Sequence, residues 1–94
     1  MPEREKFSLQ MDEQLKHVKS RIDDAKAKAE ARGQDFLQHY EQDLARLESK
    51  YDLTRYKLSL LRKGGQSAWV ELREGCERAF HDLKEALSRA MDKF

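Results

Sequence analysis

The residues best suited to chemistry are three histidines, each one helical turn from a carboxylate. These i,i+4 groups are Glu13–His17, Asp35–His39 and Glu77–His81–Glu85. Such spacing could bind a cation loosely, but helical di-iron bundles use a Glu-x-x-His motif, which does not occur in this sequence. The same spacing is typical of solvated charge pairs along a helix face. We therefore predict no metal site and no cofactor.

The remaining nucleophiles give no catalytic pattern. Cys76 is the only cysteine, which excludes an intrachain disulfide and a site built from several cysteines. Its helical neighbours Leu72 and Phe80 are apolar, as is typical of a small buried thiol. Ser67 lacks a nearby His and acid to activate it, and Gly64-Gly65 has no phosphate-binding context. We predict that the protein is not an enzyme.

Composition predicts one small helical domain over residues 1–94. Apolar residues make up 38% of the chain and charged residues 39%, with a net charge of +1. The charges alternate in sign, so no basic patch favours nucleic-acid binding. Pro2 is the only proline and β-branched residues are few, which favours helix over sheet. No secretory signal and no membrane-spanning run is recognisable, so we expect a soluble, cytoplasmic protein.

The run Lys63-Gly64-Gly65-Gln66-Ser67 is the clearest interruption in the helical pattern. We predict a long helix over about residues 3–62, a turn at 63–66 and a short helix over about 67–93. Gly64 is expected to end the first helix in the left-handed conformation. Ser67 is expected to be the N-cap of the second.

The long helix carries an apolar stripe at heptad-like steps of three and four, which predicts a coiled-coil seam. Its first part consists of Phe7, Met11, Leu15, Val18, Ile22, Ala25 and Ala29. Its second part consists of Tyr40, Leu44, Leu47, Tyr51, Thr54, Leu58 and Leu61. Gly33 and Phe36 join the two parts in phase, so the stripe stays on one face.

The short helix repeats every 11 residues, which is close to three helical turns and places the repeats on one face. The repeated positions are Trp69, Phe80 and Met91; Leu72, Leu83 and Phe94; and Cys76 and Leu87. This face predicts a partner helix of matching length.

Folding the short helix back at the turn predicts a hairpin core within residues 36–94. The expected core residues are Trp69, Leu72, Cys76, Phe80, Leu83, Leu87, Met91, Leu44, Leu47, Tyr51, Leu58 and Leu61. The expected neighbours are Trp69 with Leu60 and Leu61, Cys76 with Leu53 and Thr54, Leu83 with Leu47, and Phe94 with Phe36.

Residues 3–33 have no partner in such a hairpin. Their stripe is therefore expected to form an oligomerisation or partner interface, made of Phe7, Met11, Leu15, Val18, Ile22, Ala25 and Ala29. In this arrangement the long helix stays continuous and two or more chains pair through it. The alternative is a three-helix bundle in which the chain breaks at Gly33.

The repeat Ala68-Trp69-x-x-Leu72 and Ala79-Phe80-His81-Asp82-Leu83-Lys84-Glu85-Ala86 resembles that of a group of short bacterial coiled-coil proteins. In that group a charged helix, a glycine-containing turn and an Ala-Trp-x-x-Leu-Lys repeat follow one another. Two departures are Phe80, where the group often has Trp, and Gly33 within the long helix. The resemblance implies a non-enzymatic helical hairpin, and some members are described as stress-associated.

Together these patterns predict a coiled-coil scaffold or interaction protein that acts through a dimer, a tetramer or a helical partner. One alternative is a protein whose amphipathic repeat helix binds membrane surfaces reversibly. A second alternative is an accessory subunit of a larger complex.

Overall fold

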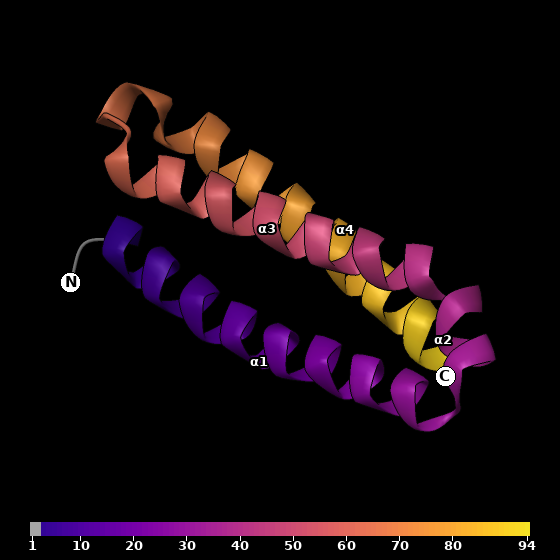
Figure 1. Ribbon diagram of the computed structural model, residues 1–94. Helices are drawn as coiled ribbons and strands as arrows, with labels where there is room; N and C mark the ends of the chain where they lie inside the picture. Colours follow the sequence, from indigo (N-terminus) through magenta and orange to yellow (C-terminus); the bar gives the residue numbers. More distant parts are fainter. Residues whose placement is uncertain (1–2) are drawn as a thin grey trace.

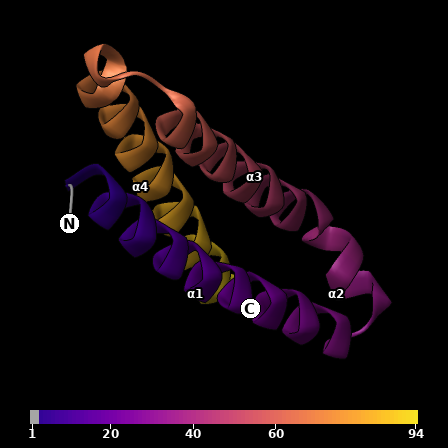
Figure 2. The same ribbon diagram turned by 90° about the vertical axis from the view of Figure 1, so that its left-hand side faces the viewer.

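The chain forms three long helices that run up, down and up beside one another (Figures 1 and 2). The computed structural model describes residues 3–94. The elements are α1 (Glu3–Ala31), α2 (Gln34–His39), α3 (Glu41–Lys63), a single 3₁₀ turn η1 (Gln66–Ala68) and α4 (Trp69–Lys93). The described residues contain no strand, which confirms the all-helical prediction.

The expected continuous helix over residues 3–62 is wrong for this structure. The helix ends at Ala31, and Gly33 has a φ of 104°, so α1 turns back along α3. The molecule measures 49 × 20 × 18 Å, whereas an unbroken helix of 60 residues would span about 90 Å. This is the three-helix arrangement that the sequence left as the alternative.

The break at Gly33 has a simple physical reason. An extended helix leaves the stripe of residues 3–33 in water, and each large apolar side chain gains about 1.5–3 kcal/mol on burial. The backbone at Gly33 costs little to bend, because glycine alone enters this positive-φ region without a steric penalty. Folding back therefore buries both halves of the stripe within one chain.

One apolar core runs the length of the bundle. Its buried members are Met11, Leu15, Val18, Ile22, Ala25, Ala29, Leu44, Leu47, Leu58, Leu61, Cys76, Phe80, Leu83, Leu87 and Ala90. Thr54 is the polar residue at its centre, and its hydroxyl donates a hydrogen bond of 2.8 Å to the carbonyl of Lys50 one turn earlier. The buried hydroxyl of Thr54 is thus hydrogen-bonded within its own helix, and the side chains around it are apolar.

The turn between α3 and α4 differs in detail from the prediction. Gly64 is extended, with φ −72° and ψ 154°, rather than left-handed. Ser67 lies inside η1, and Ala68 is the N-cap of α4, with no side-chain cap hydrogen bond. The 3₁₀ turn is closed by the amide of Ala68, which donates to the carbonyl of Gly65 at 3.2 Å.

Polar contacts fasten the start of α1 to the α3–α4 end. The guanidinium of Arg4 donates to the carbonyl of Leu61 at 2.8 Å and also to that of Gly64. Arg73 on α4 lies 3.4 Å from a carboxylate oxygen of Glu3. These contacts hold α1 in register at the end opposite to its turn.

Aromatic rings close the other end, where α1 gives way to α2. Phe94 lies edge-on to Phe36, with ring centroids 5.8 Å apart, and 5.1 Å from the ring of Tyr40. Arg32 lies over Phe36 at 4.5 Å and donates to the carbonyl of Phe94 at 3.2 Å. The prediction that Phe94 lies near Phe36 is confirmed.

Candidate interaction surface

The stripe expected to face a partner lies inside this structure. Six of its members are buried against α3 and α4, namely Met11, Leu15, Val18, Ile22, Ala25 and Ala29. Phe7 is half-buried and lies edge-on to Trp69, with ring centroids 5.9 Å apart. The stripe is therefore not a free surface in this structure, because the chain's own α3 and α4 cover it.

The predicted core residues of α3 and α4 occupy one continuous interior. Eight are buried: Leu44, Leu47, Leu58, Leu61, Cys76, Phe80, Leu83 and Leu87. Four are half-buried at its edges: Tyr51, Trp69, Leu72 and Met91. The apolar face of α4 that motivated the membrane-surface alternative is thus covered by α1 and α3.

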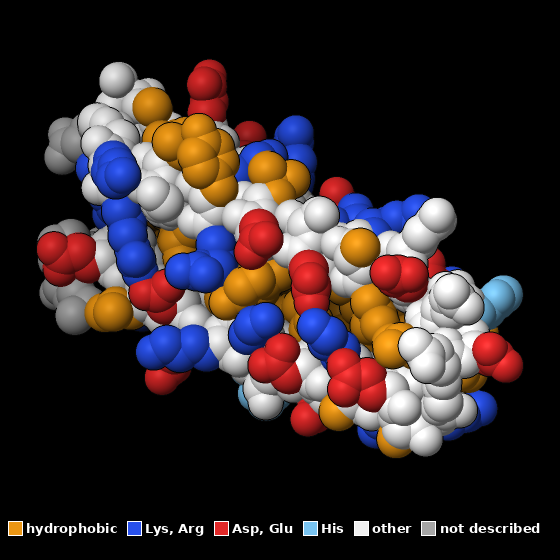
Figure 3. Space-filling model, in the orientation of Figure 1, with side chains coloured by type: hydrophobic (Ala, Val, Ile, Leu, Met, Phe, Trp, Pro, Cys, Tyr) orange, Lys and Arg blue, Asp and Glu red, His pale blue; other side chains and the backbone are white. Residues whose placement is uncertain are grey.

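A different set of apolar side chains faces outward. Leu53, Tyr56 and Leu60 are 48%, 60% and 36% exposed, and all three lie on the side of α3 away from the core. At about 100° per residue they fall within an arc of about 60°, opposite the buried stripe. We call these three residues the outer row. In Figure 3, hydrophobic side chains gather on α3 near its turn into α4, with side chains of both charges around them.

The outer row corrects two of the predicted neighbours. Leu53 was expected beside Cys76 and Leu60 beside Trp69, yet both turn outward, while Thr54 and Leu61 next to them are buried. The pattern that reveals the row is a second heptad-like series, in which Ser49 precedes it by four residues. That series is hard to recognise in the sequence because it shares α3 with the longer core stripe.

The flanks of the outer row carry opposite charges. If Leu53 and Leu60 take heptad position a and Tyr56 takes d, then Asp52 falls at g and Lys57 at e. Asp52 is exposed and Lys57 half-exposed. In a coiled coil these two positions set the orientation of the partner helix, so the row has one acidic and one basic edge.

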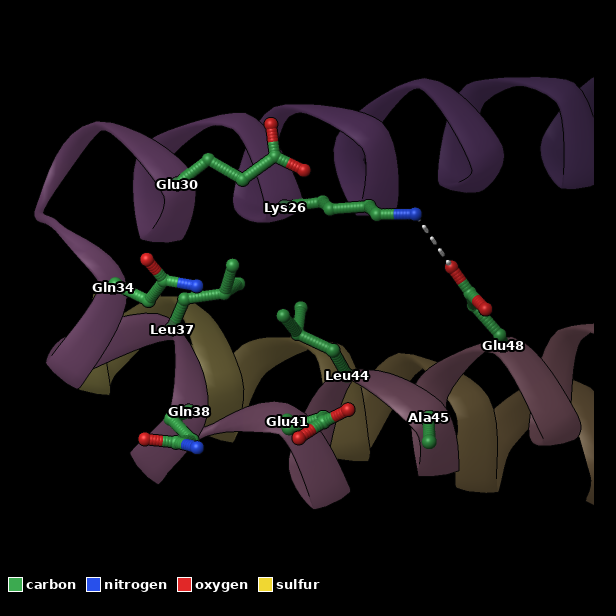
Figure 4. A pocket seen from close by; sticks show the side chains of 9 residues that line it. All are labelled: Lys26, Glu30, Gln34, Leu37, Gln38, Glu41, Leu44, Ala45 and Glu48. Carbon is green, nitrogen blue, oxygen red and sulfur yellow. Dashed lines mark ion pairs between the residues drawn. The ribbon is translucent and has the colours of Figure 1, made fainter.

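A shallow groove of about 510 Å³ lies between α1 and the α2–α3 segment (Figure 4). Leu37 and Leu44 form its floor, and the ammonium of Lys26 lies 3.7 Å from a carboxylate oxygen of Glu48 across it. The other lining residues are Glu30, Gln34, Gln38, Glu41 and Ala45. In Figure 4 the two further carboxylates stay against their own helices on opposite sides, so the polar groups do not converge on a common point.

Cys76 is fully buried in the core. Burial raises the pKa of its thiol above the ordinary value, and the neighbouring carboxylate of Glu77 adds to the rise. A protonated, inaccessible thiol is a weak nucleophile. The side chain therefore acts in this structure as a small apolar group.

The histidine groups lie on the solvated surface. The Nε2 of His81 lies 3.1 Å from a carboxylate oxygen of Glu85, and its side chain is 71% exposed. His17 and His39 are exposed as well. Within residues 3–94 no group of three or more His, Cys, Asp or Glu side chains is arranged to hold a metal ion.

In the part of the chain that the structure describes, no helix has the length and apolar content needed to cross a bilayer. Comparisons with protein-family models, curated proteins and solved structures give no match. The resemblance to short bacterial hairpin proteins therefore rests on the repeat residues alone.

Proposed function

We propose that this chain is a non-enzymatic interaction protein that self-associates through the outer row of α3. The observation that supports the proposal is the exposure of Leu53, Tyr56 and Leu60 at heptad spacing, on the face opposite a core that is already filled. Apolar side chains scattered singly on a surface are ordinary, whereas an aligned row is typical of a helix-packing contact.

The charges beside the row favour a second copy of the chain in parallel orientation. In a parallel pair, position g of one helix meets position e of the next heptad on the other, so Asp52 faces Lys57 of the second copy twice. In an antiparallel pair like positions meet, and lysine would face lysine. The row is short, so we expect a weak dimer, with a dissociation constant of about 10 μM to 1 mM.

Sedimentation equilibrium over a concentration series tests the proposal. The unchanged protein is expected to pass from monomer to dimer, and Tyr56→Glu to remain monomeric over the same range. Leu9→Glu is the matched control, because Leu9 is an exposed leucine on α1 and lies outside the row. Equal association of all three proteins, or no association of any, would contradict the proposal.

A charge substitution tests the parallel orientation of the two α3 helices in this dimer. In the parallel dimer, Lys57→Glu places two carboxylates opposite one another and should weaken association about tenfold. The charge exchange Asp52→Lys with Lys57→Glu should restore it. Unchanged association of Lys57→Glu would point to an antiparallel pair, because glutamate would then face glutamate where lysine had faced lysine.

A further inference from the structure

The break between α1 and α2 is confined to two residues. Gly33 has φ 104° and ψ 167°, a backbone region that only glycine occupies readily. Beyond it the helical hydrogen-bond pattern resumes at once: the amide of Leu37 donates to the carbonyl of Gly33 at 3.0 Å, and that of Leu44 to Tyr40 at 3.0 Å. A change of the two Gly33 dihedrals to helical values would thus align α1 with α2. A smaller adjustment at Tyr40, whose φ is −105° and ψ 11°, would then align α2 with α3.

The sequence across the break is compatible with such a straightened helix. Ala29, Gly33, Phe36 and Tyr40 follow one another at steps of four, three and four, so the apolar stripe of α1 continues in phase into that of α3. No side chain caps the start of α2 at Gly33. Straightening adds backbone hydrogen bonds there without removing a cap.

The contacts between α1 and α3 are symmetric about a point close to this break. The ion pairs Arg62–Asp12 and Lys26–Glu48 both have their midpoint at about residue 37. Two straightened helices that cross antiparallel at that residue would form both pairs between chains instead of within one. The surface of α3 and α4 that receives α1 would then receive the identical α1 of a second copy.

We infer that Gly33 is the hinge of a domain exchange, in which two copies straighten at this residue and swap α1. The partner is a second copy of this chain, and the docking surface is the core face of α3 and α4 lined by Leu47, Leu61 and Leu83. Because all core contacts are kept, the balance between closed monomer and exchanged dimer depends on the hinge and on protein concentration. This contact is separate from the outer row of α3.

Gly33→Ala tests the hinge. Alanine is strained in the closed turn and favours the straight helix, so the dissociation constant of the exchanged dimer should fall about a thousandfold. The variant is made in the Tyr56→Glu background, so that association through the outer row does not contribute. Gly75→Ala in the same background is the control, because Gly75 lies inside α4 with open space around its Cβ position. It should stay monomeric by sedimentation velocity.

A distance measurement identifies the exchange itself. Spin labels at Glu5 and Lys63 lie near one another in the closed chain, where Arg4 contacts Leu61. In an exchanged dimer diluted with unlabelled protein, the same labels should separate to about 90 Å. A monomeric Gly33→Ala protein, or a dimer that keeps the short distance within one chain, would overturn the inference.

A second experiment decides the matter if Gly33→Ala does not fold. The Tyr56→Glu protein is refolded from denaturant at high concentration, beside a version of it lengthened by Gly-Ser-Gly after Gly33, because a longer hinge favours closure. An exchanged dimer that forms only without the insertion supports the hinge. Monomer from both proteins, or dimer from both, refutes it.

Discussion

Ile22 offers the sharpest test of whether α1 belongs to the fold of its own chain. Its side chain, in the second half of α1, is 1% exposed and is among the largest fully buried groups of the core. Ile22→Ala removes three carbon atoms and leaves a cavity, a change that costs about 2–5 kcal/mol in well-packed cores. The total stability of a domain is about 5–15 kcal/mol, so the loss is a large fraction of it.

The assay is thermal unfolding followed by circular dichroism at low protein concentration. For a domain of this size each kcal/mol shifts the Tm by about 4–8 °C, so a loss of 3 kcal/mol corresponds to about 12–24 °C. The transition should remain single, because α1 shares one core with α3 and α4. Leu9→Ala, on the exposed face of α1, should stay within about 0.5 kcal/mol of the unchanged protein. An unaltered Tm for Ile22→Ala, or separate melting of α1, would refute the reasoning.

Two further changes test the interior and the α3–α4 turn. Because burial raises the pKa of Cys76, the folded chain keeps the thiol proton while the unfolded chain loses it above about pH 9. The protonated thiol's contribution to the free energy of unfolding is complete below that pH and falls as the pH rises through the folded pKa. The difference in unfolding free energy between the unchanged protein and Cys76→Ala should therefore narrow from pH 8 to 10. Urea titrations at each pH measure this difference. At Gly64 an added Cβ would lie 2.6 Å from Leu72 Cδ1 and 3.1 Å from the Leu60 carbonyl oxygen. Gly64→Ala should therefore lower the free energy of unfolding by about 1–3 kcal/mol, as measured by chemical denaturation. Gly65→Ala, with open space at its Cβ position, should lower it by less than about 0.5 kcal/mol. Equal effects of the two substitutions would contradict this account.

The stripe of α1 shows how far sequence reasoning could go. Periodicity selects Leu15, Val18 and Ile22 for burial, because side chains three and four residues apart share a helix face. It does not say which chain covers them, since the same face fits an intrachain or an intermolecular partner equally well. Whether the stripe packs within its own chain or against another chain depends on the backbone of Gly33. Glycine permits both a helical and a left-handed conformation there at similar cost.

The outer row was missed for a different physical reason. Leu53 and Leu60 stand beside Thr54 and Leu61, and two adjacent residues on a helix differ in direction by only about 100°. The heptad stripe selects Thr54 and Leu61 for burial, and the structure agrees. The approximate hairpin register also places Leu53 and Leu60 inward, because it does not distinguish a residue from its immediate neighbour.

The elongated shape has a consequence for how the molecule tumbles. Its length of 49 Å is more than twice its width, and the three long helices follow that length (Figure 1). Amide N–H bonds in a helix point along its axis. They therefore reorient with the slow end-over-end rotation, and nitrogen-15 relaxation should assign the helical amides a longer correlation time than a sphere of 11.1 kDa would have.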